Sequence, residues 1–123
     1  MLTVIVDGNN LFRDLGLDRK LNSAPGEGFL QKLELAAASN DWDVTVVFDG
    51  PQRFLPREEG LLVVRYASPG TTADTLIEQM VYKTADRTQV VVVTRDRAEG
   101  NLILGLGARV WTAQRLQEEL ERT

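Results

Sequence analysis

The chain contains no cysteine and no histidine among its 123 residues. The lack of cysteine excludes a disulfide framework and a thiolate zinc site, and it fits a reducing, cytoplasmic setting. The lack of histidine removes the commonest general base and excludes Ser-His and Cys-His nucleophile systems. Any chemistry must therefore use carboxylates, amides, hydroxyls and basic groups.

Long apolar runs and a surplus of positive charge are also absent. No run approaches the roughly 20 apolar residues that a membrane span needs, and the first residues lack the basic region of a signal peptide. We therefore expect no membrane association. The net charge of −4 argues against a broad basic surface for nucleic acid. A bound cation could still supply a local positive field.

The sequence does carry enough apolar residues, 43%, to build a core. Its length is that of one domain, and we expect a single domain over 1–123. Five short runs rich in β-branched residues predict strands. Their near-continuous apolar character indicates burial on both faces, as in a parallel sheet. These runs are 2–6, 44–48, 61–66, 90–94 and, more weakly, 108–111.

Helical spacing of apolar residues falls between the strands. The pattern predicts helices over 28–40, 72–85, 97–104 and 112–122, with turn-forming loops near 22–28, 50–60 and 68–70. Alternating strands and helices indicate an α/β fold. We expect a three-layer α/β/α sandwich around a mainly parallel central sheet.

Aspartates follow several predicted strands. Asp7, Asp49 and Asp96 come directly or two residues after the first, second and fourth strands. The carboxyl ends of parallel strands share one edge, where ligands bind. Asp74 lies in the first turn of a helix that follows the third strand, so it points to that edge as well. Each aspartate has a simpler interpretation as a turn former or helix cap, and Asp74 is the least certain direct ligand.

Carboxylates that cluster repel one another unless a cation neutralises them. Oxygen ligands suit Mg²⁺ or Mn²⁺. Such a metal lowers the pKa of a bound water and stabilises charge on a scissile phosphate. The four aspartates therefore predict a metal centre for phosphodiester hydrolysis that needs no histidine.

Neighbouring residues add candidates for substrate contact and support. Asn10 and Thr94 are placed to hold the acidic site. Phe54 is a candidate for stacking on a base, whereas Trp42 and Trp111 are expected to pack in the core. Candidates for contacting substrate phosphates, with solvated surface arginines as the alternative interpretation, are Arg13, Arg53, Arg95 and Arg97.

Four ordered motifs resemble the YacP-like NYN-domain family of the PIN-like nuclease group. They are VIVDGNNL at 4–11, VVFDG at 46–50, TADTLIE at 72–78 and VTRDR at 93–97. The resemblance covers almost the whole chain. It implies a PIN-like fold and a metal-dependent endoribonuclease, and it suggests a link to mRNA on the ribosome. By position, the family's catalytic residues match Asp7, Asn10, Asp49, Asp74 and Asp96.

The chain departs from the family pattern at three positions. Asn9 replaces a tyrosine, Thr75 stands where many members carry a second acid, and Arg95 replaces a small residue. The change at Thr75 leaves open whether one or two metals bind. Two other functions also remain open from the sequence. One is a phosphohydrolase for small phosphate esters, and the other is a degenerate acidic module that binds RNA or protein.

Overall fold

Five parallel strands form one sheet in the computed structural model, which describes residues 1–17, 24–50, 52, 54 and 56–122. The strand order is β3-β2-β1-β4-β5, so β1 is central. Each predicted strand is confirmed to within two residues at either end. The strands are β1 (Leu2–Asp7), β2 (Trp42–Phe48), β3 (Leu62–Tyr66), β4 (Val90–Val93) and β5 (Arg109–Trp111).

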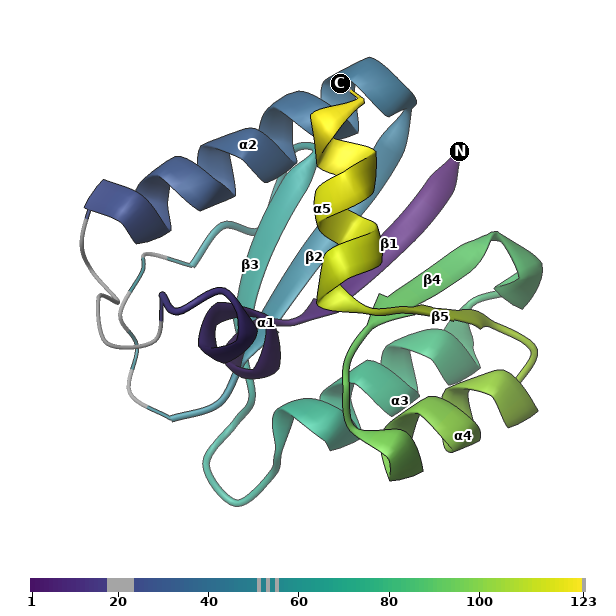
Figure 1. Ribbon diagram of the computed structural model, residues 1–123. Helices are drawn as coiled ribbons and strands as arrows, with labels where there is room; N and C mark the ends of the chain where they lie inside the picture. Colours follow the sequence, from purple (N-terminus) through teal and green to yellow (C-terminus); the bar gives the residue numbers. More distant parts are fainter. Residues whose placement is uncertain (18–23, 51, 53, 55, 123) are drawn as a thin grey trace.

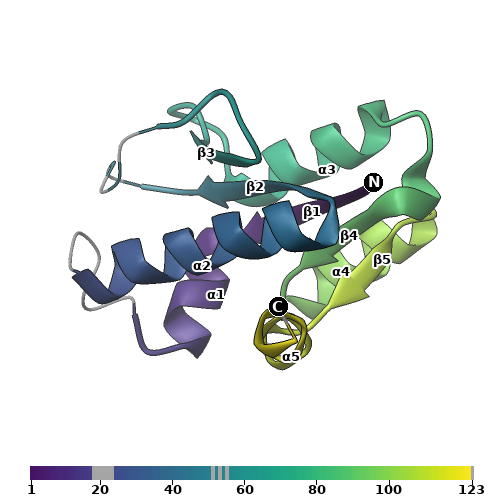
Figure 2. The ribbon, with the colours of Figure 1, turned by 90° about the horizontal axis from the view of Figure 1, so that it is seen from above.

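Helices cover both faces of the sheet. One face carries α1 (Gly8–Asp14), α2 (Ala24–Asn40) and α5 (Ala113–Glu121), and the other carries α3 (Ala73–Lys83) and α4 (Arg97–Gly105) (Figures 1 and 2). A short 3₁₀ turn, η2 (Arg87–Gln89), precedes β4. This arrangement confirms the predicted three-layer sandwich with a parallel sheet.

Two apolar cores lie between these layers. Along β1, Val4 and Val6 face the core under α1, α2 and α5, whereas Ile5 faces the core under α3 and α4. This alternation follows from the two-residue repeat of a strand. Because apolar side chains fill both faces of β1, only the ends of the central strands can present polar groups to solvent.

An aromatic cluster closes the first core near the carboxyl end of the sheet. The ring of Phe12 makes edge-to-face contacts with Phe29, Phe48 and Phe54, with centroids 5.4–5.8 Å apart. Phe54 is only 4% exposed. Its prediction as a base-stacking residue is therefore wrong, because the ring is committed to packing. The Tyr66 hydroxyl also holds the backbone of Phe54: it accepts a hydrogen bond from the Phe54 N–H and donates one to the Phe54 carbonyl.

The tryptophan prediction is confirmed, since Trp42 and Trp111 are buried and pack edge-to-face against each other. Two helix predictions needed correction. The helix expected from residue 28 begins at Ala24. The loop predicted over 22–28 is therefore wrong for residues 24–28, which belong to α2, and residues 22 and 23 lie outside the described part of the chain. The helix α1 was not expected at all. It begins because the Asp7 side chain accepts from the backbone of Asn10, three residues later.

Candidate metal centre

Asp7 stands where the central strand ends and α1 begins. One carboxylate oxygen accepts from the Asn10 N–H at 3.4 Å, and the other accepts from the Asn10 side-chain amide at 2.5 Å. Asp7 is only 3% exposed. Asn10 therefore holds the Asp7 carboxylate by two hydrogen bonds at the carboxyl edge of the sheet.

Asp74 lies in the first turn of α3 and is half-buried. Thr72 caps this helix by accepting from the Thr75 N–H at 3.1 Å. The Thr75 hydroxyl lies 3.1 Å from that of Thr72, so Thr75 belongs to the cap. The cap formed by Thr72 and Thr75 therefore fixes the first turn of α3, which carries Asp74.

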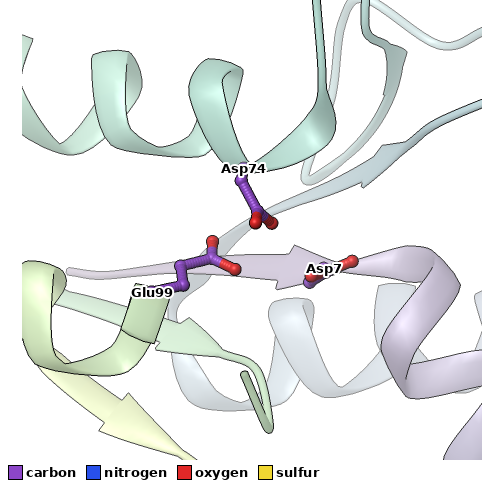
Figure 3. Close-up of side chains that lie close together, drawn as sticks. All are labelled: Asp7, Asp74 and Glu99. Atoms are coloured by element: carbon purple, nitrogen blue, oxygen red, sulfur yellow. The ribbon is translucent and has the colours of Figure 1, made fainter. Parts of the chain in front are cut away.

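A third acid, Glu99, completes the cluster, and sequence reasoning missed it. Asp7, Asp74 and Glu99 each offer an oxygen within 4.8 Å of the others. Figure 3 shows the Glu99 side chain reaching from α4 toward Asp74, with Asp7 beside them at the end of β1. Glu99 is 3% exposed, and its Oε1 is buried with no hydrogen-bond partner within the described part of the chain. Such an orphaned oxygen is costly unless a cation or proton occupies the space before it.

The electrostatics of the cluster favour a cation. Burial, followed by the nearby Asp74 carboxylate, raises the pKa of Glu99 to about 9. Burial also raises the pKa of Asp7, against the lowering effect of its hydrogen bonds from Asn10. A divalent ion would relieve this repulsion and satisfy the buried oxygens. The donor set is three hard carboxylates, which suits Mg²⁺ or Mn²⁺.

Asp49 lies directly after β2 at the same edge, as expected. Its Oδ1 accepts from the Ala73 N–H at 2.7 Å, so the side chain holds the first residue of α3. The Asp49 backbone N–H donates to the Asn9 side-chain oxygen at 2.7 Å. Among the described acids, Asp49 does not join the three-carboxylate group, although its charge contributes to raising the pKa of Asp7.

Asp96 caps α4 and in this way orients Glu99. Its Oδ1 accepts from the N–H groups of Ala98 and Glu99, at 3.0 and 3.2 Å. Thr94 is buried and donates to Glu99 Oε2 at 3.3 Å, while it accepts from the Asp96 N–H at 3.1 Å. Asp96 itself is exposed and outside the three-carboxylate group of the described residues. The alternative interpretation of Asp96 as a cap therefore matches its contacts.

The arginines expected near substrate are exposed where the structure describes them. Arg13 lies in the last turn of α1, and Arg97 opens α4. Arg95 forms an ion pair with Asp14 at 2.8 Å but keeps 59% of its side chain exposed. The prediction for Arg53 concerns a residue outside those described.

Glu99 carried a signal that could have revealed it. Like Asp74, it lies in the first turn of a helix that follows a strand, and such a turn faces the carboxyl edge of the sheet. The spacing from Asp96 to Glu99 also fits a capping box, in which the glutamate would turn back to the cap. Here the Asp96 N–H donates to the Thr94 hydroxyl instead. The Glu99 carboxylate is therefore not used in a capping box and can approach Asp7 and Asp74.

Comparison with known proteins matches one family profile, and the similar crystal structures include two of the same protein. The profile of the YacP-like NYN domain matches residues 4–123. The first structure is Rae1 (YacP) from Bacillus subtilis, with 26% identity, a TM-score of 0.80 and coverage of 99% of this chain and 75% of that one. The second is a single-site variant of the same protein, with 26% identity, a TM-score of 0.77 and coverage of 98% and 74%.

No curated protein sequence matches the chain significantly. In the part of the chain that the structure describes, no helix has both the length and the apolar character to cross a membrane. The family profile spans nearly all of the sequence, and the fold agrees with that of the similar structures. The chain therefore belongs to the YacP-like NYN domain family.

Proposed function

We propose that this protein is a metal-dependent endoribonuclease whose cation is held by Asp7, Asp74 and Glu99. One observation carries the proposal. Three carboxylates from different elements converge within 4.8 Å, and one buried oxygen, Glu99 Oε1, has no protein partner among the described residues. NYN domains are nucleases, which gives such a centre a reaction to serve.

The residues around the cluster divide the work of holding it. Asn10 orients Asp7 through two hydrogen bonds, and Thr94 orients Glu99. Asp49 and Asp96, expected from the sequence as ligands, are assigned to fixing the starts of α3 and α4. A bound Mg²⁺ or Mn²⁺ would activate water and stabilise charge developing on a phosphate.

RNA is the substrate that we propose. The family resemblance points to it, and exposed arginine side chains could contact its phosphate backbone. Arg13, Arg95 and Arg97 are candidates for these contacts. An acidic protein can bind RNA at such a place because the metal and a few arginines supply positive charge locally. The family resemblance implies that this RNA is single-stranded or flexible.

The direct test measures cleavage of end-labelled RNAs, one structured and one unstructured, with Mn²⁺, Mg²⁺ or EDTA. We expect internal cleavage with either metal and none with EDTA. The variants Asp7→Asn, Asp74→Asn and Glu99→Gln should lose at least about 100-fold in rate, because each removes charge from the centre. Glu118→Gln, at an exposed position of α5, is the matched control. Unchanged cleavage by the three site variants would refute the assignment.

A ribosome-bound mRNA substrate is the finer form of the same proposal, and it is carried by the family resemblance alone. Cosedimentation with ribosomes in a sucrose gradient tests it. The Asp7→Asn variant should be used so that RNA is not degraded during the run. Recovery of the protein only in the ribosome-free fractions, at low as well as moderate salt, would restrict the substrate to free RNA.

A further inference from the structure

A series of hydrogen bonds links the acidic cluster to Asn9, a residue outside it. Asn9 follows Asp7 by two positions and lies in the first turn of α1. Its side-chain oxygen accepts from the Asp49 N–H at 2.7 Å, and its amide donates to the Asp49 carbonyl at 3.5 Å. Asn9 thus hydrogen-bonds to both the N–H and the carbonyl of Asp49, the residue directly after β2.

The next contact passes from β2 to α3. The Asp49 side chain accepts from the Ala73 N–H at 2.7 Å. Ala73 is buried and immediately precedes Asp74, one of the three clustered acids. Two consecutive contacts therefore join the start of α1, which carries Asp7 as its cap, to the start of α3.

The start of α1 also packs closely against the end of β2. A Cβ on Gly8 would lie 2.6 Å from the Phe48 ring, so only glycine allows the start of α1 to approach the end of β2 this closely. Phe48 immediately precedes Asp49. The approach of Gly8 to Phe48 and the grip of Asn9 on Asp49 fix the same pair of elements.

We propose that Asn9 and Asp49 are positioning residues that set the separation of Asp7 and Asp74 and thereby tune metal affinity. The inference rests on the proposed metal centre and deepens it. It departs from the simplest expectation for Asp49, in which an acid at this edge binds metal itself. A positioning role needs the hydrogen-bond acceptor of Asp49, whereas a ligand role needs its negative charge.

The variants Asp49→Asn and Asp49→Ala separate these roles. Asparagine keeps an oxygen that accepts from the Ala73 N–H but carries no charge, and alanine removes both. We expect Asp49→Asn to bind Mn²⁺ within about 3-fold of the parent protein. Asp49→Ala should bind about 10-fold to 100-fold more weakly, which is the usual cost of losing a group that supports a ligand. Calorimetric titration with Mn²⁺ alone gives these affinities without any RNA.

Asn9→Ala tests the first contact in the same titration. We expect Mn²⁺ affinity to fall about 10-fold, while Asn101→Ala, at an exposed position of α4, has no effect. In RNA cleavage the loss for Asn9→Ala should be recovered by raising Mn²⁺, with little change in the KM for RNA. An RNA-binding role for Asn9 would instead raise that KM.

A second measurement needs no metal. Asn9 is linked to Ala73 through Asp49. The proposal predicts that Asn9→Ala speeds exchange of the Ala73 amide proton by about 10-fold, because local opening becomes easier. Unchanged exchange would overturn the connection. Equal losses of Mn²⁺ affinity in Asp49→Asn and Asp49→Ala would also overturn it and make Asp49 a ligand. If the parent protein binds no Mn²⁺, the proposed function fails, and the exchange rate alone decides the positional link.

Discussion

Replacing Glu99 with glutamine should stabilise the metal-free protein, and the gain should grow with pH. The pKa of this acid rises from 4.5 to about 9 because it is buried and lies against Asp74. Between those two values the folded protein keeps a proton that the unfolded chain has lost. Stability therefore falls as pH rises through this window, by up to about 1.4 kcal/mol per pH unit.

The size of the effect follows from the distance of pH 7 from the ordinary pKa of the group. Neutral pH lies about 2.5 units above 4.5, so keeping Glu99 protonated costs at most about 3.4 kcal/mol there. Glutamine is neutral at every pH, has nearly the same shape, and keeps an oxygen for the Thr94 hydroxyl. The Glu99→Gln variant should therefore match the parent protein near pH 5, exceed it by about 1–3 kcal/mol at pH 7, and exceed it by more at pH 8.

Urea unfolding in EDTA, followed by the fluorescence of the buried Trp42 and Trp111, measures this difference at several pH values. Glu118→Gln serves as the exposed control and should leave the pH profile unchanged. Asp7, whose pKa is also raised, should leave a smaller slope in the Glu99→Gln protein. The reasoning is refuted if Glu99→Gln and the parent protein lose stability in parallel between pH 5 and 9.

Three further predictions follow from the same contacts. Gly8→Ala should destabilise the fold by about 1–3 kcal/mol in urea unfolding, because its Cβ would press on the Phe48 ring; a cost that persists undiminished in a Phe48→Leu background would contradict this cause. Asp96→Ala should cost about 1 kcal/mol through the lost helix cap, whereas Asp96→Asn should cost only a few tenths and keep most Mn²⁺ affinity; a large affinity loss in Asp96→Asn would make Asp96 a ligand. Saturating the parent protein with Mn²⁺ at about 100 times its Kd should add about 2.7 kcal/mol to the free energy of unfolding, and Glu99→Gln should gain little of this; an equal gain in both proteins would place the ion elsewhere.

The sheet and most helix positions were readable from the sequence because strand burial and helical spacing leave strong periodic signals. The strand ends then placed Asp7 and Asp49 at one edge without any knowledge of contacts. The helix α1 was missed because only seven residues form it, too few for a clear apolar stripe. Its start depends on a side-chain cap that periodicity does not reveal.

The membership of the acidic cluster was harder to predict, for a geometric reason. An aspartate at a strand end has several nearby N–H groups, and its short side chain is readily taken up by them, as for Asp49 and Asp96. The side chain of Glu99 is longer than that of an aspartate. It does not cap its own helix and instead extends to the neighbouring acids Asp7 and Asp74. Sequence position identifies the edge of the sheet, but not which carboxylate oxygens converge there: Asp7 caps α1 and still belongs to the cluster.

The strand order has a kinetic consequence. The clustered acids come from the end of β1, from α3 beyond β3, and from α4 beyond β4, so the centre forms only after both wings of the sheet have docked on β1. A metal ion thus has no complete site in a half-assembled chain and cannot nucleate folding. Its effect should fall on the unfolding rate, and the holoprotein should resist unfolding longer while refolding no faster.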